Sequence, residues 1–299
     1  MLLIPGLCGE SVFLSVDHFH RPEETLHAES LRREAGGKGY NQAVAARRAG
    51  AEVFFLGAVG RDAGAALCRE QLQKEGIGCR FFLREEATAY AAILTDRKGE
   101  NRVTVYPGAK LSASDIEESR AVFEKADMLL ITPEIPEDAF DRATSLALET
   151  GIPTVVNPAP FVPWLRGYLD RACLLTPNEA EARALLGLSE AEDLSRAAAE
   201  APWDMVITLG ARGALSVRDH VPLFLPAPKV HAVDTTGAGD CLNGVLCAGL
   251  ERGMRQDEAA GRAVAAASLS VTRRGVMDAL PRREEFDGPG VSAVYDKEE

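Results

Sequence analysis

Residues 128–156 of the chain read MLLITPEIPEDAFDRATSLALETGIPTVV. The apolar runs Met128–Ile131 and Thr154–Val156 are each of strand length and stand beside Asp or Pro residues. Between them, the apolar positions of Glu137–Glu149 recur with the spacing of a helix that buries one face. A strand, a helix and another strand in this order are typical of a parallel sheet covered by helices.

The same alternation continues on both sides of this stretch. Further strand-length apolar runs lie at Val53–Leu56, Cys173–Leu175 and Val206–Leu209. Helical periodicity fills the gaps at Gln42–Ala49, Ala63–Lys74, Glu179–Leu186, Leu242–Leu250 and Asp257–Ser270. The sequence therefore predicts an α/β fold in which a mostly parallel sheet is sandwiched by helices.

Two stretches, Glu10–Arg33 and Cys79–Tyr106, carry strand-like sequence without intervening helices. We predict that they form a small separate β-sheet, inserted as a lid into a single domain of residues 1–299. An exposed lid sheet favours a homodimer, because bare strand edges tend to be covered. The tail after Phe286 is polar, and we expect it to be loosely held.

Composition and charge exclude several classes of partner. The formal net charge of −12 argues against nucleic acid, because phosphate backbones bind basic surfaces. No segment reaches the roughly 18 consecutive apolar residues of a membrane span, and Met1–Gly9 reads as a first strand rather than as a signal peptide.

The six cysteines are scattered without a C-x-x-C pair, which is typical of reduced thiols in a cytoplasmic protein.

The first chemical signal is Asp234-Thr235-Thr236-Gly237-Ala238-Gly239-Asp240, which precedes a helical pattern. Its small residues let the backbone turn sharply and aim amides at an anion beside a helix N-terminus. A carboxylate there, Asp240, suits a base that takes a hydroxyl proton while the amides hold a phosphate charge. A helix cap is the competing interpretation, because Asp is favoured in the first turn.

A glycine-rich loop, Gly36-Gly37-Lys38-Gly39-Tyr40-Asn41-Gln42, opens an earlier helix. Its glycines permit close approach of the backbone to a ligand, and Asn41 offers both a donor and an acceptor to hydroxyl groups. The loop is not a P-loop, because Gly39 follows the lysine where Ser or Thr is required. A tight structural turn is the alternative.

The third signal, Thr176-Pro177-Asn178-Glu179-Ala180-Glu181, follows a predicted strand. Asn178 and Glu181 lie on one face of the starting helix. Together they can position a phosphate and, through water, Mg²⁺, which prefers few carboxylates and several waters. An acidic first turn that complements the helix dipole is the alternative.

In combination these segments resemble the ribokinase family of carbohydrate and nucleoside kinases (the PfkB group) over nearly the whole chain. The matching residues are Gly36-Gly37-Lys38-Gly39, Asn41, Gly50 and Gly60, then Asn157–Pro160, Thr176–Glu179, Thr208–Gly213, Asp234-Thr235, Gly237–Asp240 and Asn243-Gly244. The resemblance implies an α/β sandwich with a β-lid, a sugar site under the lid, and ATP along the carboxyl ends of the strands. It implies an ATP-dependent kinase that phosphorylates a hydroxymethyl group of a sugar or sugar-like substrate.

The resemblance also implies roles for individual residues. The base is Asp240, and the anion hole is formed by the amides of Gly237, Ala238, Gly239 and Asp240. The sugar-facing positions are Gly37, Lys38, Gly39, Asn41 and Glu134. The ATP contacts are Asn178, Thr208, Gly210, Arg212 and Gly213. Glu181 helps to hold Mg²⁺ through water, and Asp234, Thr236, Ser270, Arg273 and Gly275 match a loop that binds a monovalent cation, K⁺, in potassium-activated members.

The chain departs from the family pattern in its substrate-facing residues. Gly9-Glu10-Ser11 stands where ribokinases carry Asn-x-Asp, so that Ser11 offers one neutral hydrogen bond in place of a carboxylate. Tyr40 stands where a small Ala is usual, and we expect it to add an aromatic face and a hydroxyl beside the substrate loop. The sequence thus predicts an altered sugar preference.

A further departure is Cys241, which follows the base where Thr is common. The N-terminus of a helix can lower a thiol's pKa, which would make Cys241 a redox-sensitive group beside the phosphate site. The alternative is a small residue that faces the core, since free Cys is usually buried and inert.

Other functions stay open at this point. They are a nucleoside kinase of the same family, a non-catalytic regulator that binds a metabolite, and a nicotinamide-dependent oxidoreductase on a similar scaffold. The regulator would need a damaged base or anion hole, and neither is seen. The oxidoreductase is disfavoured because no good G-x-G-x-x-G follows the first strand.

Overall fold

The computed structural model describes residues 1–287, and the polar tail expected to be loosely held lies almost entirely outside that range. Within it, the main sheet has nine strands in the order β13-β12-β11-β10-β9-β8-β1-β4-β5. The strands are β1 (Leu2–Pro5), β4 (Val53–Val59), β5 (Gly78–Leu83), β8 (Met128–Ile131), β9 (Thr154–Val156), β10 (Leu174–Leu175), β11 (Met205–Thr208), β12 (Gly213–Arg218) and β13 (Val221–Pro226). Neighbours from β5 to β11 pair in parallel, and β12 and β13 continue the sheet as antiparallel strands.

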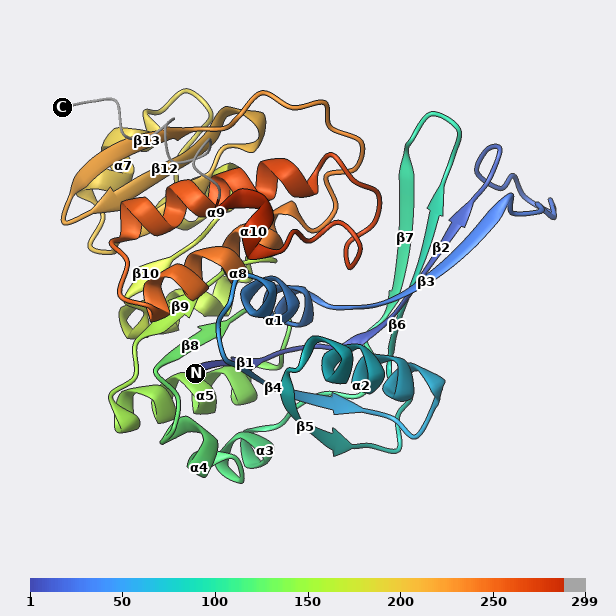
Figure 1. Ribbon diagram of the computed structural model, residues 1–299, viewed down its shortest axis with the longest axis horizontal. Coiled ribbons are helices and arrows are strands. Elements are labelled where there is room, and N and C mark those ends of the chain that lie inside the picture. Colours follow the sequence, from blue (N-terminus) through green and yellow to red (C-terminus); the bar gives the residue numbers. More distant parts are fainter. Residues whose placement is uncertain (288–299) are drawn as a thin grey trace.

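Helices cover both faces of this sheet, which confirms the predicted sandwich (Figure 1). One face packs against α1 (Lys38–Arg48), α2 (Ala63–Glu75), α8 (Ala238–Glu251), α9 (Gln256–Ser270) and α10 (Arg283–Phe286). The other packs against α3 (Ala113–Glu117), α4 (Arg120–Phe123), α5 (Glu137–Thr150), η1 (Pro163–Arg171), α6 (Glu179–Leu186) and α7 (Leu194–Glu200). In β1, Leu2 and Ile4 belong to one core and Leu3 to the other. The strand is apolar throughout because both of its faces are buried.

A separate four-stranded sheet projects from one end of the body as a lid (Figure 1). Its order is β3-β2-β6-β7, and its strands are β2 (Gly9–Ser15), β3 (Ser30–Gly36), β6 (Ala89–Thr95) and β7 (Asn101–Tyr106). The second lid segment therefore begins at Ala89 and not at Cys79 as expected. Residues Gly78–Leu83 form β5, whose register with β4 places them at the edge of the main sheet.

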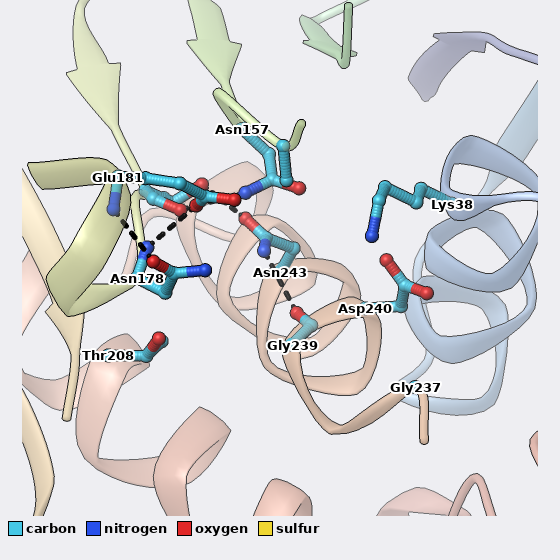
Figure 2. Close-up of a pocket in the computed structure, with 11 residues that line it drawn as sticks. Lys38, Asn157, Asn178, Glu181, Thr208, Gly237, Gly239, Asp240 and Asn243 are labelled. Carbon is cyan, nitrogen blue, oxygen red and sulfur yellow. Dashed lines mark hydrogen bonds between the residues drawn. The ribbon is translucent and has the colours of Figure 1, made fainter. Parts of the chain in front are cut away.

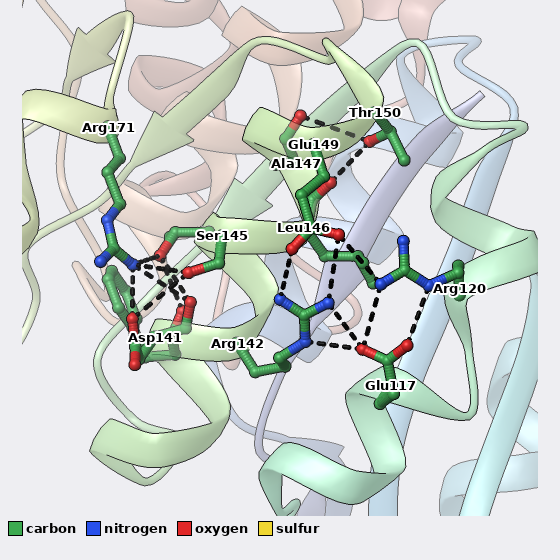
Figure 3. Close-up of polar contacts among 12 residues, drawn as sticks. Glu117, Arg120, Asp141, Arg142, Ser145, Leu146, Ala147, Glu149, Thr150 and Arg171 are labelled. Carbon is green, nitrogen blue, oxygen red and sulfur yellow. Dashed lines mark hydrogen bonds and ion pairs between the residues drawn. The ribbon is translucent and has the colours of Figure 1, made fainter.

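An ion-pair network fastens the segment of α3 and α4 to the outer face of α5, as Figure 3 shows. The Arg142 guanidinium lies between Glu149 at 2.8 Å and Glu117 at 2.6 Å. Arg142 and Arg120 hold the pKa of Glu149 down at about 2, so that Glu149 stays ionised through the neutral range. The network is solvated and contributes to the scaffold rather than to the pocket.

Over residues 1–287, the helices are all too short or too polar to cross a bilayer.

Candidate active site

The three motifs converge on one pocket at the carboxyl ends of the parallel strands, beside the N-terminus of α8 (Figure 2). Its lining includes Lys38, Asn157, Thr176, Asn178, Glu181, Thr208, Gly237, Gly239, Asp240 and Asn243. Figure 2 shows Asn178, Glu181 and Thr208 on one side of this pocket and Lys38 and Asp240 on the other. Segments far apart in the chain meet here because parallel strands bring their carboxyl ends to one edge of the sheet.

Asp240 lies in the first turn of α8 and is buried, with 7% of its surface exposed. Its Oδ2 accepts a hydrogen bond from Asn41 Nδ2 at 2.8 Å, and its Oδ1 accepts one from Gln42 Nε2 at 3.0 Å. Burial raises the pKa of Asp240, while the charge of Lys38 and the two amide donors oppose that rise. These neighbours orient the carboxylate and favour its ionised form, as a base requires.

Gly237 forms the turn that exposes the N-terminus of α8. It is the N-cap residue and has a φ of 77°, in the left-handed region that favours glycine. A Cβ at Gly237 would lie 2.7 Å from Cγ1 of Val276, which packs on this turn. The Ala238 amide donates to Thr235 O at 3.3 Å, whereas Gly239 and Asp240 have first-turn amides, which lack partners within the helix. The expected anion hole therefore rests on Gly239 and Asp240 more than on Ala238.

The glycine-rich segment is shorter as a loop than the sequence predicts, because α1 already begins at Lys38. It runs from β3 into α1, and a Cβ at Gly37 would overlap the backbone of Leu7. The Lys38 amide donates to Glu134 Oε2 at 2.7 Å, which joins this loop to the chain after β8. Burial raises the pKa of Glu134 to about 7. The Ser11 hydroxyl lies over the loop, 3.0 Å from the point where a Cβ of Gly36 would be.

Four polar residues of the motifs, for which the sequence predicted no role, connect Asp240 to the first turn of α8. Gln42 donates to Asn157 Oδ1 at 3.0 Å as well as to Asp240, and Asn157 donates to the Thr176 carbonyl at 2.8 Å. The Thr176 hydroxyl donates to Asn243, which in turn donates to the Gly239 carbonyl at 2.9 Å. For Asn157 and Thr176 the available signal was a polar residue directly after an apolar strand, whereas Gln42 and Asn243 lie within helices and carried no such signal.

Asn178 and Glu181 form a reciprocal cap of α6, whose first turn is acidic as the alternative interpretation expected. Asn178 Oδ1 accepts from the Glu181 amide at 2.8 Å, and Glu181 Oε2 accepts from the Asn178 amide at 2.9 Å. Both also line the pocket, and burial raises the pKa of Glu181. Capping and a place in the pocket are thus compatible.

The remaining predicted ATP contacts lie on the chain after β11. Thr208 lines the pocket itself. Gly210 and Arg212 lie in the short helix η2 (Gly210–Arg212), and Gly213 begins β12. The Arg212 guanidinium is exposed and pairs with Glu179. These three residues lie outside the group of residues that lines the pocket.

The predicted cation loop is partly brought together. Asp234 Oδ1 accepts from the Thr236 amide and Oδ2 from the Gly275 amide, each at 3.0 Å. Burial opposes ionisation of Asp234, but these hydrogen bonds outweigh it and lower its pKa. The Ser270 hydroxyl donates to Ala267 O within α9, and the Arg273 side chain pairs with Glu285. The side chains of Ser270 and Arg273 are thus both engaged elsewhere, and the Arg273 amide donates to the Ser270 carbonyl at 3.1 Å.

The structure contradicts the expected role of Tyr40. Its ring is fully buried and packs edge-on against Phe55, and its hydroxyl donates to Cys68 O at 2.8 Å. The first turn of α1 directs residue 40 into the core while Lys38 and Asn41 face the pocket. Tyr40 therefore fills space between α1, α2 and the sheet and offers no group to a substrate.

The structure also contradicts a reactive Cys241. The thiol is fully buried, and burial raises its pKa to about 12. Desolvation by the α1 and α8 packing outweighs the helix N-terminus, so that the thiolate is disfavoured. The interpretation of Cys241 as a small core residue is the one confirmed.

Phosphoryl transfer to a small molecule is the chemistry that these groups support together. An ionised carboxylate can take a proton beside helix amides that stabilise phosphate charge, and a lid can exclude water above them. The chain matches the profile of the pfkB family carbohydrate kinases over residues 8–283, and it belongs to that family.

Individual relatives agree with this assignment. The ribokinase of Bacillus subtilis is 34% identical over 295 residues, which cover 96% of this chain and 98% of that protein. A ribokinase structure from Thermotoga maritima matches with a TM-score of 0.87 and 31% identity, over 96% of this chain and 97% of the other. An Arabidopsis thaliana ribokinase complexed with ribose and ATP matches with a TM-score of 0.85 and 25% identity, over 99% of both chains.

The hydrogen bond from Gln42 leads to a prediction about pH. We expect Gln42→Leu to move the acid limb of the kcat/KM profile upward by roughly one pH unit. The amide stabilises the carboxylate of Asp240, so that its loss raises the pKa of the base and requires a higher pH for ionisation. The measurement is kcat/KM from pH 4 to pH 9. Tyr40→Phe is the control, because Tyr40 lies two positions before Gln42 on α1 but is directed into the core, and it should leave the profile unchanged. An acid limb that does not move in Gln42→Leu would contradict the assignment of Asp240 as base.

Proposed function

We propose that the chain is an ATP-dependent kinase that transfers the γ-phosphoryl group to a hydroxymethyl group of a small sugar. One observation carries the proposal. A buried carboxylate, Asp240, is held by Asn41 and Gln42 in the first turn of a helix, inside a pocket at the carboxyl ends of parallel strands. Membership of the pfkB carbohydrate kinases and similarity to ribokinases support it.

In the proposed reaction, Asp240 takes the proton of the sugar hydroxyl as its oxygen attacks the γ-phosphorus. The bond from that phosphorus to the β–γ bridging oxygen breaks, and ADP leaves with the electron pair. The amides of the Gly237–Asp240 turn hold the charge on the transferred group. The proton ends on Asp240, whose pKa is already raised by burial, so that it can receive one.

The two substrates are proposed to occupy opposite sides of the pocket. The sugar would contact Gly37, Lys38, Gly39, Asn41, Glu134 and Ser11, beneath the lid. ATP would contact Asn178 and Thr208 and extend over the loop of Gly210, Arg212 and Gly213. The separation of Lys38 and Asp240 from Asn178 and Thr208 across the pocket supports this arrangement (Figure 2).

Mg²⁺ is proposed to bind with the nucleotide near Glu181. Among residues 1–287, no group of three or more Asp, Glu, His or Cys side chains is placed to hold a metal ion. A single carboxylate fits Mg²⁺, because this ion keeps several waters and takes further oxygens from substrate phosphates. When bound, Mg²⁺ would neutralise phosphate charge, while Glu181 continues to cap α6.

The experiment that tests this function is an ATP-consumption screen with purified protein. The panel contains sugars, deoxysugars, sugar acids and nucleosides, with product mass confirmed for each active compound. Phosphorylation of a sugar supports the proposal. A preference for nucleosides would reassign the chain within the family, and the absence of turnover with every compound would favour a non-catalytic binding protein.

Within that panel, we expect D-ribose to be a poor substrate compared with a bulkier or less hydroxylated sugar. Ser11 supplies one neutral hydrogen bond where a carboxylate is usual, and lost charged acceptors weaken discrimination. Glu34 faces Ser11 across the β2–β3 ladder, but its oxygens are engaged by Arg32 and the Val276 amide. Since Tyr40 is buried, this prediction rests on Ser11, and ribose with the highest kcat/KM would refute it.

A monovalent cation is proposed to bind between the chain around Asp234 and that around Gly275. The Asp234 carboxylate joins these two loops, and K⁺ held there by carbonyl oxygens would rigidify the adjacent Gly237 turn. We therefore expect faster turnover in KCl than in NaCl or choline chloride at equal ionic strength. Equal rates in the three salts would remove the cation from the proposal and leave the kinase reaction intact.

We further propose that the protein acts in the cytoplasm as one domain, with a small molecule and not nucleic acid or a membrane as its partner. Its net charge of −12 supports the part of this proposal that concerns nucleic acid. A homodimer through the lid is proposed because β7 is exposed along its whole length, including Val103, Val105 and Tyr106. Comparing the oligomeric state of the wild-type protein and of Val103→Lys by sedimentation would test that contact, because a charge on an edge strand opposes pairing.

A further inference from the structure

One lid residue, Glu34, is buried although most of the lid is not. It lies on β3, where the preceding residues are exposed or half-buried, and only 7% of its own surface is exposed. A buried carboxylate is costly unless hydrogen bonds and charges compensate it. The hydrogen-bond partners of Glu34 therefore show which part of the protein stabilises its buried charge.

Those partners lie in the body and not in the lid. Glu34 Oε2 accepts from the Val276 amide at 3.1 Å and, at the outer limit, from the Met277 amide at 3.5 Å. The other oxygen pairs with Arg32, two positions away on the same face of the strand. Residues 276 and 277 lie between α9 and α10, so that Glu34 connects β3 of the lid to this segment of the body.

The segment that Glu34 holds also supports the proposed anion hole. The Gly275 amide donates to Asp234 Oδ2 at 3.0 Å, and the Val276 side chain packs against the Gly237 turn. A Cβ at Gly275, whose φ is 82°, would overlap the Arg32 guanidinium and lie 2.6 Å from Glu34 Oε1. The lid pair thus fits closely against this segment.

The far end of the segment is held separately. Arg48 of α1 donates to the carbonyls of Met277 at 2.6 Å and Leu280 at 2.8 Å. Two carboxylates hold the end next to Gly237: Asp234, from its own loop, accepts from the Gly275 amide, and Glu34, from the lid, accepts from the Val276 amide.

We propose that Glu34 is a positioning residue that couples docking of the lid to formation of the anion hole. With the lid docked, the carboxylate fixes the Val276 amide, and the Val276 side chain then supports the Gly237 turn. With the lid lifted, that support is lost, and the amides of Gly239 and Asp240 are less ordered. By linkage, a phosphate held by those amides favours the docked lid to the same extent. This inference rests on the proposed role of the Gly237–Asp240 turn.

The test compares Glu34→Ala and Glu34→Gln with Arg33→Ala. Arg33 neighbours Glu34 on β3, its side chain is 59% exposed, and it pairs only with Glu10 among the described ion pairs. Glutamine keeps an acceptor for the Val276 amide, so that Glu34→Gln should keep most of the ordering that Glu34→Ala loses. The first readout is hydrogen–deuterium exchange of peptides covering 234–241 and 272–280 in the free protein, which requires no substrate.

We expect Glu34→Ala to speed exchange in both peptides by roughly tenfold or more, because a charged acceptor to a buried amide is lost. Glu34→Gln should fall between Ala and wild type, and Arg33→Ala should match wild type. Faster exchange at 272–280 alone would overturn the proposal, since Glu34 would then stabilise only the segment that it contacts and not the Gly237 turn.

Kinetics give the second readout. The anion hole acts in the transition state, so that Glu34→Ala should lower kcat and kcat/KM together and leave KM for the sugar near wild type. A change confined to KM would also overturn the proposal. If wild type phosphorylates no compound, the proposed function fails, while the exchange pattern still decides the coupling.

Discussion

We expect Asp240→Asn to lower kcat by about 10²–10⁴-fold, the usual contribution of a general base, with little change in the binding of ATP or sugar. The asparagine keeps the shape of the side chain and removes the proton acceptor. The fold should tolerate it, because Asn41 Oδ1 and Gln42 Oε1 have no hydrogen-bond partner within residues 1–287. Either amide can rotate to accept from the new NH₂ group.

Steady-state kinetics and nucleotide titration of the same preparation check this result. Asp115→Asn is the matched control, because Asp115 is also a buried carboxylate, 5% exposed, but pairs with Arg84 away from the pocket. It should cost stability and leave kcat near wild type. A near-wild-type kcat in Asp240→Asn would make Asp240 a helix cap and remove it from the mechanism.

The second large effect is expected where α8 crosses α1. A Cβ at Gly244 would lie 2.5 Å from the carbonyl oxygen of Gln42 and 2.6 Å from the Ala45 Cβ. We expect Gly244→Ala to destabilise the protein by about 1–3 kcal/mol through overpacking. It should also push α8 off α1 and separate Asp240 from Asn41 and Gln42, and a misplacement of about 1 Å can lower kcat by roughly 10²-fold.

Thermal unfolding and kcat, measured below the unfolding range, separate these two consequences. Gly167→Ala is the control, because a Cβ at Gly167 meets nothing within 4 Å. It should change neither quantity. If Gly244→Ala lowered stability but kept kcat, the contact between the two helices would not set the position of the base.

Much of the scaffold could be predicted because its strands are buried on both faces. Met128–Ile131 and Thr154–Val156 begin and end as expected, since an apolar run between turn residues leaves few alternatives. The helix Glu179–Leu186 is equally well defined by its cap and its terminal glycine. Asp240 could be placed in the first turn of a helix because it stands between Gly237-Ala238-Gly239 and the helical pattern of residues 242–250.

Other features depend on contacts that no local pattern contains. Gln42 meets Asp240 across 198 residues of sequence, and only the packing of α1 on α8 brings them together. The direction of Tyr40 follows from where α1 starts, at Lys38 rather than at Gln42. The strand Gly78–Leu83 resembles a lid strand in sequence, and its pairing with β4 is a matter of topology.

The contact between α1 and α8 also bears on how the protein is made. α1 ends at Arg48, whereas α8 ends at Glu251, so the ribosome must synthesise most of the chain before the two can meet. Until then the alanine-rich side of α1 is not covered by α8, and Asp240 has not yet been synthesised. The nascent protein can therefore hold neither a finished core nor a working site, and it becomes a candidate for chaperone binding late in synthesis.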